Sequence, residues 1–344
     1  MVLFTSMTKL LLLCACYNCP MKIMVTGCAG FIGSHLSERL TSLGHEVIGV
    51  DKFSDYYPVF LKELNAKDLE SKGVKIYKRD ILTSDLTDIC KDIDFVFHLA
   101  ATPGISDKIP YEEYLNNNEL ATFKLLQHFR KSPNLKCFFN ISTSSVYGAF
   151  ATDAENADPK PTSYYGVTKL AAEQLALSYS REEGFPACSF RLFSVYGERE
   201  RPDKFYPRLI MALLEGREVP LYEGSEKHIR SYTYISDIID GFILGLDKYK
   251  KCCGEIFNLG TDKTNTTGDA MRIAQEIVNK PLKIKRLPKR TGDQEKTSAN
   301  IEKIKRVLGY ASDTTLEEGL EKDISWFKNR ILGKYNYWEE VFGK

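Results

Sequence analysis

Tyr165 and Lys169 have the residue types and the spacing of an acid–base pair. They belong to the run Tyr165-Gly-Val-Thr-Lys169, which opens a helical segment extending to about Glu183, so the i,i+4 spacing places the phenol and the ammonium on one helix face. A free tyrosine has a pKa of about 10 and is a poor base near neutral pH. The adjacent ammonium favours the phenolate and lowers that pKa, which makes Tyr165 a candidate proton acceptor from an alcohol that is being oxidised.

A second set of polar side chains follows the apolar segment 135–141. The run Asn140-Ile-Ser-Thr143-Ser-Ser-Val-Tyr-Gly148 gathers hydroxyl groups just past the end of this predicted strand. In an open α/β sheet, ligands bind beyond the carboxyl ends of the strands. We therefore expect these hydroxyls to lie in the same site as Tyr165.

Three glycines with the spacing G-x-x-G-x-x-G, Gly27, Gly30 and Gly33, lie between a first short strand and its helix. Such a loop lets backbone N–H groups approach a pyrophosphate at the positive end of the helix. Asp51 ends the second strand, 18 residues beyond Gly33, where a carboxylate accepts hydrogen bonds from an adenosine ribose and repels a 2′-phosphate. The pattern predicts NAD rather than NADP. The cationic nicotinamide of NAD+, together with Lys169, would stabilise the Tyr165 phenolate and lower its pKa. The alternative is structural: the glycines only permit tight helix packing, and the aspartate only caps a turn.

The order of the segments predicts what positions these residues. Apolar strands are expected at residues 22–26, 46–51, 74–79, 93–100 and 135–141, and they alternate with helical segments, clearest at 34–43 and 111–131. Continuous apolar strands alternating with amphipathic helices indicate an α/β fold. We expect a doubly wound parallel sheet of the Rossmann type, covered by helices on both faces.

Beyond about residue 190 the alternation loosens, and prolines separate shorter strands and helices. We expect an NAD-binding domain at residues 21–190 and a smaller α/β domain, mainly for the substrate, at residues 191–344. A helix and a strand at residues 236–258 are apolar enough to return to the first sheet. The segment at about 231–258 is therefore assigned to the first domain.

Composition and charge exclude several classes of partner. Hydrophobic residues make up 43% and charged residues 27% of the 344 residues, as in soluble globular chains. A formal net charge of +1 provides no global field for nucleic acid or for an anionic membrane. No stretch approaches the ~20 apolar residues of a spanning helix. We expect neither nucleic acid nor a membrane as a partner.

The nine cysteines are odd in number and irregularly spaced, which argues against a disulfide framework and for a reducing, cytoplasmic setting. Cys14, Cys16 and Cys19 are followed by Cys28, which lies in the glycine loop, so no fourth thiolate completes a metal site and no metal is expected. The apolar run at residues 10–17 superficially resembles a short signal peptide. It leads almost directly into the nucleotide-binding fold, and we expect residues 1–20 to be an extension that is disordered or not native.

These motifs together resemble those of the extended short-chain dehydrogenases/reductases that act on nucleotide sugars. The matching residues are Gly27 to Gly33, His98-Leu-Ala-Ala101, Ser142-Thr143, Val146-Tyr-Gly148, Tyr165 to Lys169 and Arg191-Leu-Phe193. The resemblance extends from Met21 to about residue 330. It implies that Thr143 and Tyr165 hydrogen-bond the sugar 4-hydroxyl, that Tyr165 takes its proton, and that Lys169 also holds the nicotinamide ribose.

The resemblance also implies which residues line the two ligands. The NAD-binding set is Gly27, Gly30, Phe31, Ile32, Gly33, Asp51, Asp80, Ile81, Leu99, Ala100, Ala101, Tyr165, Lys169 and Phe193. The substrate-binding set is Pro103, Thr143, Ser144, Ser145, Ser194, Arg201, Arg230, Arg290 and Asp293. In the family, Arg230 and Arg290 fall where the diphosphate of a nucleotide sugar is contacted, and Asp293 falls near its ribose.

The residues beside Thr143 discriminate among the reactions of the family, all of which begin with hydride transfer from the sugar to NAD+. The 4,6-dehydratases carry an acidic pair there and the uronate decarboxylases a glutamate, whereas this chain has Ser144 and Ser145. Hydroxyl groups with pKa values far above 7 cannot supply the general acid and base that dehydration needs. Ser194 stands where neutral-sugar epimerases usually have asparagine and uronate 4-epimerases a small hydroxyl residue.

Arg201 is the candidate ligand for a sugar carboxylate. The run Gly197-Glu-Arg-Glu-Arg201-Pro-Asp203 resembles that of the uronate 4-epimerases, and a planar guanidinium suits a carboxylate. The alternative is a surface arginine paired with Glu198 or Glu200. Two departures from the uronate pattern, Ser106 for arginine and Glu198 for proline, concern the phosphate or carboxylate side and leave the chemistry at C4 intact.

The resemblance therefore implies NAD-dependent 4-epimerisation of UDP-glucuronate to UDP-galacturonate through a transient 4-keto sugar. The alternatives are a UDP-glucose or UDP-N-acetylglucosamine 4-epimerase, a UDP-glucuronate decarboxylase, and a non-catalytic NAD-binding regulator. The helical segments at 111–131 and 164–183 resemble those of a four-helix homodimer interface. Its candidate contacts are Leu120, Phe123, Leu175 and Leu177, for which core packing is the other explanation.

Overall fold

The computed structural model describes residues 20–106, 108–148, 151–288 and 296–342. The extension expected at residues 1–20 lies outside the described residues except for Pro20, and so do Arg290 and Asp293. Within the described ranges, no helix combines the length and the apolar character needed to cross a membrane.

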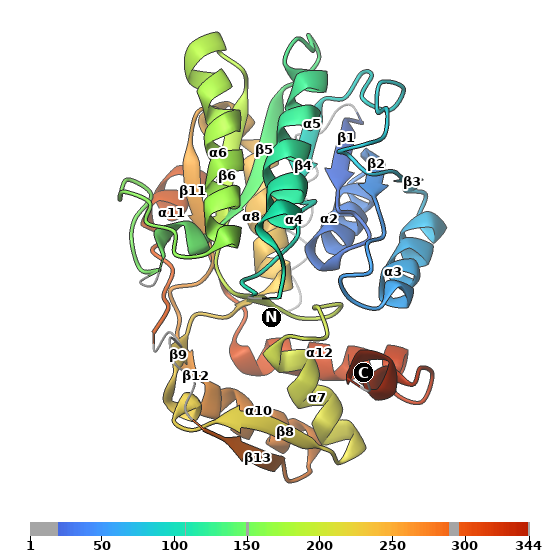
Figure 1. The fold of residues 1–344 in the computed structure, drawn as a ribbon, viewed down its shortest axis with the longest axis vertical. Coiled ribbons are helices and arrows are strands. Elements are labelled where there is room, and N and C mark those ends of the chain that lie inside the picture. Colours follow the sequence, from blue (N-terminus) through green and yellow to red (C-terminus); the bar gives the residue numbers. More distant parts are fainter. Residues whose placement is uncertain (1–19, 107, 149–150, 289–295, 343–344) are drawn as a thin grey trace, which may run out of the picture.

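A seven-stranded parallel sheet forms the centre of the larger part of the molecule, in the order β11-β6-β5-β4-β1-β2-β3 (Figure 1). Its strands are β1 (Lys22–Thr26), β2 (Glu46–Asp51), β3 (Lys75–Lys78), β4 (Phe95–His98), β5 (Cys137–Thr143), β6 (Ala187–Leu192) and β11 (Ile256–Leu259). The first two have the expected bounds. β4 ends two residues early because the Ala100 N–H donates to the Thr26 hydroxyl oxygen and not to a strand backbone. The expected doubly wound parallel sheet is confirmed.

Alternating side chains of the strands enter two cores, one on each face of the sheet. In β1, Ile23 and Val25 join one hydrophobic cluster, whereas Met24 joins the other. Helices α2 (Phe31–Ser42), α3 (Val59–Ser71) and α8 (Ile235–Asp247) pack on the first face. Helices α5 (Ala121–Phe129) and α6 (Tyr164–Glu183) pack on the second. This alternation is the period-two pattern of a strand that is buried on both faces.

The helix expected at residues 111–131 consists of three consecutive parts. It begins as α4 (Tyr111–Tyr114), changes to a π-helical turn η2 (Leu115–Leu120) and continues as α5. Asn118, in the π-helical turn, is fully buried and exchanges hydrogen bonds with the Thr102 backbone. The interruption therefore lies beside the loop that follows β4.

The smaller part lies at one end of the sheet and is made mainly of the chain after β6 (Figure 1). Three two-stranded sheets, β10-β7, β12-β9 and β13-β8, accompany its helices. Its strands are β7 (Val195–Tyr196), β8 (Glu218–Tyr222), β9 (Ile229–Arg230), β10 (Thr233–Tyr234), β12 (Asn265–Thr266) and β13 (Lys283–Leu287). The helices not yet named, from both parts of the molecule, are η3 (Ser144–Tyr147), α7 (Phe205–Glu215), η4 (Ser225–Lys227), α9 (Tyr249–Cys252), α10 (Thr267–Val278), α11 (Glu302–Leu308), α12 (Leu316–Trp326), η5 (Phe327–Ile331) and α13 (Tyr337–Phe342).

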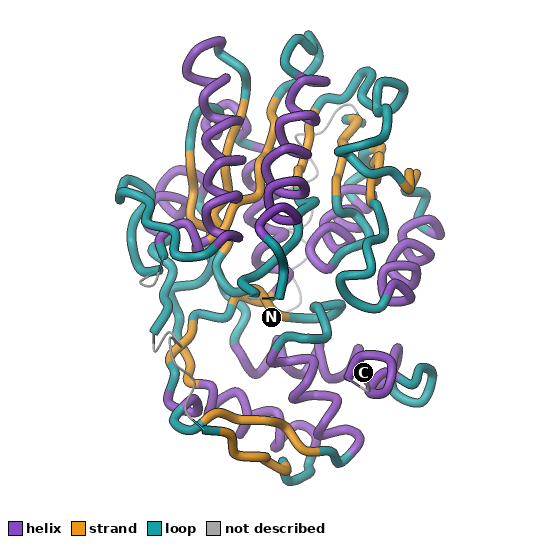
Figure 2. The backbone as a smooth tube through the Cα atoms, viewed as in Figure 1, coloured by secondary structure: helices purple, strands orange, loops and turns teal. Residues whose placement is uncertain are grey.

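The chain returns to the large sheet after it has entered the smaller part. Helix α8 packs against the core of the first face, and β11 pairs in parallel with β6. Loops lie between the sheet and the smaller part (Figure 2). The division of the chain into two domains at about residue 190 stays a prediction.

Candidate functional site

The glycine loop between β1 and α2 has room for backbone only. Gly27 has a φ of +69°, and a Cβ on Gly33 would lie 2.1 Å from the Gly27 carbonyl oxygen. A Cβ on Gly27 would lie 3.0 Å from the Ala100 nitrogen, so this loop also packs closely on the loop after β4. Gly30 caps the 12-residue helix α2, whose first N–H groups are free to bind an anion. The cradle fits the pyrophosphate of a dinucleotide.

Asp51 supports this cradle from the end of β2. Its carboxylate accepts hydrogen bonds from the Ala29 N–H (3.1 Å) and the Phe53 N–H (2.8 Å). Burial raises the pKa of Asp51, although these N–H groups and the charge of Lys62 oppose the rise. Asp51 therefore does cap a turn, as the structural alternative proposed. A further role for Asp51 at a ribose stays a prediction.

Tyr165 lies in the first turn of α6, opposite the end of β5. The helix starts here because the Ser163 side chain caps it by accepting the Gly166 N–H at 3.1 Å. Burial raises the pKa of Tyr165, while a hydrogen bond with Thr143 and the charge of Arg201 lower it. The groups that favour the phenolate are thus Thr143 and Arg201. The spacing in the sequence had instead predicted that Lys169 favours it.

Lys169 is buried one turn further along α6, with 3% of its surface exposed. Burial lowers the pKa of its ammonium to about 8, and the charge of Glu173 opposes this. Its own charge helps to lower the pKa of His98 to about 3, although burial is the larger cause. The ammonium therefore lies between α6 and the end of β4, beside the loop against which Gly27 packs.

His98 is a buried strand residue, as expected, and it joins two hydroxyl groups. Its Nδ1 lies 2.8 Å from Thr26 Oγ1 and its Nε2 lies 2.8 Å from Thr122 Oγ1. Thr122 donates to the Asn118 carbonyl, and Thr26 accepts from the Ala100 N–H. These bonds are all satisfied by a neutral imidazole that is protonated at Nε2, which agrees with its lowered pKa. His98 thus holds the loop after β4 and is not a base.

Arg201 is buried and reaches the same loop from the smaller part. Its Nη1 donates to Pro103 O at 2.7 Å, its Nε lies 2.8 Å from the Asp203 carboxylate, and its guanidinium lies 5.0 Å from the centre of the Tyr56 ring. With 9% of its surface exposed, it is not a surface arginine paired with Glu198 or Glu200. That alternative is wrong in exposure and in partner, since the ion pair of Arg201 is with Asp203 and Glu198 instead accepts the Tyr234 hydroxyl.

Two tyrosines in this group were not predicted from the sequence. Tyr56 donates to Pro103 O at 3.0 Å, and Tyr114 donates to Gly104 O at 2.7 Å. The Tyr114 ring lies 6.2 Å from that of Tyr165. The available signal was positional: Tyr56 follows β2 at the carboxyl edge of a parallel sheet, where ligands bind.

The remaining candidates are distributed as follows. Ser144 and Ser145 begin η3, where Ser145 shares hydrogen bonds with Thr143, whereas Ser194 is exposed. Asp80 follows β3, and its carboxylate accepts the Leu82 N–H. Arg230 lies in β9 of the smaller part, where β9 pairs with β12. The half-buried candidates are Phe31, Ile32, Leu99, Ala100, Ala101 and Pro103, and the buried ones are Ile81 and Phe193.

Large apolar side chains are exposed on the outer face of the helices that carry Tyr165 and Asn118. Leu120 and Phe123 are 39% and 41% exposed, and Tyr164 and Val167 on α6 are 57% and 41% exposed. Leu177, expected on this face, is buried at 2%. That expectation was wrong because Leu177 lies on the side of α6 that faces the sheet. We call Leu120, Phe123, Tyr164 and Val167 the apolar helix face.

Comparison with known proteins gives consistent results. Residues 23–260 match the model of the NAD dependent epimerase/dehydratase family. The crystal structure of UDP-glucuronic acid 4-epimerase from Bacillus cereus, in complex with UDP-glucuronic acid and NAD, is 36% identical with a TM-score of 0.84 and covers 90% of this chain and 99% of its own.

Two sequence relatives carry different substrate names. UDP-glucuronate 4-epimerase 4 of Arabidopsis thaliana is 33% identical over 92% of this chain and 77% of its own length. A Bacillus subtilis protein named as a UDP-glucose epimerase is 36% identical over 91% of this chain and its whole length. The names of these relatives therefore share epimerase activity on a UDP-sugar but differ in the sugar.

Proposed function

Because the chain belongs to the NAD-dependent epimerase/dehydratase family, we propose that it interconverts UDP-glucuronate and UDP-galacturonate at C4. The observation that carries the proposal is the buried Arg201, which donates to Pro103 O in the loop after β4 at 2.7 Å and interacts electrostatically with Tyr165. This arrangement brings the candidate proton acceptor beside a buried cation that a neutral sugar does not require. The bound UDP-glucuronic acid in the B. cereus relative supports the same substrate class.

The residues divide the chemistry among them. NAD+, when bound, would supply the acceptor for the hydride from C4, and the NADH so formed would supply the donor that returns the hydride to the other face of the ketone. Tyr165 takes the proton of the 4-hydroxyl, with Thr143 holding the phenol, and returns it after the 4-keto sugar has rotated. Arg201 binds the sugar carboxylate and keeps its C–C bond poorly aligned with the ketone. This alignment matters because a 4-keto uronate is a β-keto acid that is prone to lose CO2.

The glycine cradle and the lysine serve the cofactor in this proposal. The N–H groups at the start of α2 bind the pyrophosphate, and Gly27, Gly30 and Gly33 let it approach the backbone. In this proposal the buried Lys169 ammonium holds the nicotinamide ribose. Burial lowers the pKa of this ammonium to about 8, so Lys169 sits in a largely water-excluded part of the site.

Proton NMR of the purified protein tests the proposal. The protein is incubated with UDP-glucuronate or UDP-glucose, each with and without added NAD. We expect UDP-galacturonate resonances and no pentose. Pentose together with CO2 would identify a decarboxylase, turnover of the neutral sugar alone would reject the roles of Arg201 and Ser194, and NAD binding without turnover of either sugar would identify a regulator.

UDP-glucose 4-epimerisation is the second candidate function, and one observation favours it. The Arg201 guanidinium is already engaged by the Asp203 carboxylate and by Pro103 O. A substrate carboxylate must replace or join Asp203, whereas a neutral sugar leaves that pair intact. Comparing the two sugars in the NMR experiment separates the candidates.

We also propose a cytoplasmic homodimer that is formed through the apolar helix face. Exposed leucine, phenylalanine, tyrosine and valine side chains on adjoining helices favour burial against a second copy. The six described cysteines are free thiols, which supports a reducing compartment. Sedimentation at low concentration tests the dimer, and a persistent monomer would reject it.

A further inference from the structure

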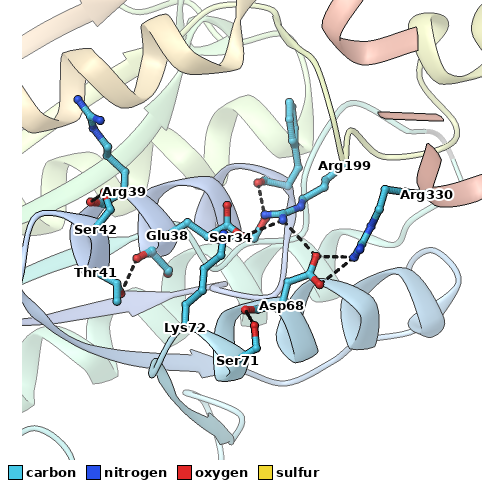
Figure 3. A network of polar contacts seen from close by, with 12 residues as sticks. Ser34, Glu38, Arg39, Thr41, Ser42, Asp68, Ser71, Lys72, Arg199 and Arg330 are labelled. Carbon is cyan, nitrogen blue, oxygen red and sulfur yellow. Dashed lines mark hydrogen bonds and ion pairs between the residues drawn. The ribbon is translucent and has the colours of Figure 1, made fainter. Parts of the chain in front are cut away.

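The loop that carries Arg201 is tied to the cofactor-binding helix by a second arginine. Arg199 lies two residues before Arg201, has a φ of +69° and exposes 9% of its side chain. Its Nη2 donates to Glu38 on α2 at 2.8 Å and to Asp68 on α3 at 3.3 Å (Figure 3). Neither Arg199 nor its partners belong to the site described above.

Two further cations complete this cluster, which we call the Arg199 hub: Glu38, Asp68, Lys72, Arg199 and Arg330. Lys72 lies 3.0 Å from Glu38, and Arg330 of η5 donates to both oxygens of Asp68 at 2.8 and 2.7 Å (Figure 3). Although burial alone would raise the pKa of Glu38, its bonds with Arg199 and Lys72 lower it. The hub therefore joins three parts of the chain through charged contacts: the loop that carries Arg199, the helices α2 and α3, and the C-terminal segment that carries Arg330.

A second tether holds the same loop one turn away on α2. His35 Nε2 lies 2.9 Å from the Glu198 carbonyl, and the Glu198 carboxylate accepts the Tyr234 hydroxyl at 2.7 Å. Burial and the charge of Arg199 lower the pKa of His35, so a neutral ring donates through Nε2. Because His35 and Glu38 are three residues apart, they present one face of α2 to residues 198 and 199.

The loop is thus fixed at both ends. Residues 198 and 199 bind the helix whose amino end forms the glycine cradle, and Arg201 binds Pro103 O in the loop after β4. Arg199 bridges the Glu38 and Asp68 carboxylates through one nitrogen, Nη2, so it ties its loop to α2 and to α3 at once. Four of the five hub side chains are partly exposed, and such ion pairs add little net stability, so geometry is the better account of the hub.

We propose that Arg199 is a positioning residue that fixes Arg201 relative to the cofactor and thereby sets the preference for an acidic sugar. This inference rests on the proposed function, since it assumes that Arg201 binds the substrate carboxylate. The hydrogen bonds of the Arg199 side chain go to Glu38 and Asp68, and it belongs to neither of the two candidate ligand-binding sets. Misplacing a binding group by about 1 Å costs up to roughly 100-fold in rate.

The test is a double-mutant cycle on the NAD-loaded enzyme. Arg199→Met leaves each hub carboxylate with a cation, because Lys72 still pairs with Glu38 and Arg330 with Asp68. We expect kcat/KM for UDP-glucuronate to fall roughly 10- to 100-fold, chiefly through KM, and that for UDP-glucose to change far less. In an Arg201→Met background, Arg199→Met should have no further effect on the acidic sugar.

Two controls complete the design. Arg272→Met removes an arginine of equal charge from an exposed pair with Glu276 on α10 and should leave both sugars unaffected. Glu38→Gln breaks the hub from the other side and should reproduce the loss for UDP-glucuronate if Arg199→Met does not fold.

Each result is decisive. Equal losses for the two sugars, or additive losses in the cycle, overturn the positioning role while leaving the proposed function intact. A wild-type enzyme that shows no preference for UDP-glucuronate overturns the proposed function, and this inference with it.

Discussion

The hydrogen bond between Thr143 and Tyr165 offers the sharpest test of the acid–base assignment. Thr143→Val keeps the shape of the side chain but removes the hydroxyl that favours the Tyr165 phenolate. A hydrogen bond to a charged group contributes about 1.5–3 kcal/mol, and 1.36 kcal/mol corresponds to a factor of ten. We expect kcat at neutral pH to fall roughly 10- to 150-fold.

The pH dependence of kcat separates this explanation from general damage. The reaction needs the phenolate, so kcat falls as the pH drops below the pKa of Tyr165. Losing a group that lowers this pKa moves the acid limb of the profile to higher pH, and activity should recover partly in alkaline buffer. The assay measures initial rates of epimer formation by NMR between pH 6 and pH 10 on the NAD-loaded enzyme, in which the positive charge of the nicotinamide lowers the pKa of Tyr165 toward this range.

Thr143→Ser is the matched control, since it keeps the hydroxyl and should retain both the rate and the position of the acid limb. The reasoning is refuted if Thr143→Val lowers kcat equally at every pH. It is also refuted if the valine and serine variants behave alike.

Three further perturbations have defined outcomes. Gly33→Ala puts a Cβ 2.1 Å from the Gly27 carbonyl, so NAD affinity measured by fluorescence titration should fall by at least tenfold, or about 1.4 kcal/mol; unchanged affinity would reject the cradle. Arg191→Met leaves the fully buried Glu173 carboxylate without its cation, which now binds it with two hydrogen bonds of 2.6 and 3.0 Å. The free energy of unfolding, measured by urea titration, should fall by about 3–5 kcal/mol. The double substitution of Arg191 and Glu173 by Met should restore much of that loss. Phe123→Glu places a charge on the apolar helix face and should convert the proposed dimer to a monomer in sedimentation. Leu177→Glu, at a buried position, should instead unfold the chain.

The sequence predicts well whatever depends on neighbours along the chain. The bounds of β1 and β2, the glycine turn and the helix that begins at Tyr164 agree with the expectations from apolar runs, a glycine spacing and helical spacing. Each of these signals lies within one element, so local rules are sufficient.

The contacts that complete the site are made between distant residues. His35 meets the Glu198 carbonyl across 163 residues, and Arg201 meets Pro103 across 98. Nothing local marks Arg199 as different from Arg201, and only the fold turns one toward Glu38 and the other toward Tyr56. The same reason explains the error at Leu177, because helical spacing does not say which side of a helix faces a sheet.

The late return of β11 to the sheet has a consequence for synthesis of the chain. Sixty-three residues separate Leu192, the end of β6, from Ile256, the start of β11. At ribosomal rates of about 5–20 residues per second, the outer edge of β6 stays unpaired for roughly 3–13 s. An apolar strand with open backbone groups is a template for pairing with another chain during that interval. Nascent chains that stall within the smaller part are therefore the ones most exposed to aggregation, even though the finished sheet buries this edge.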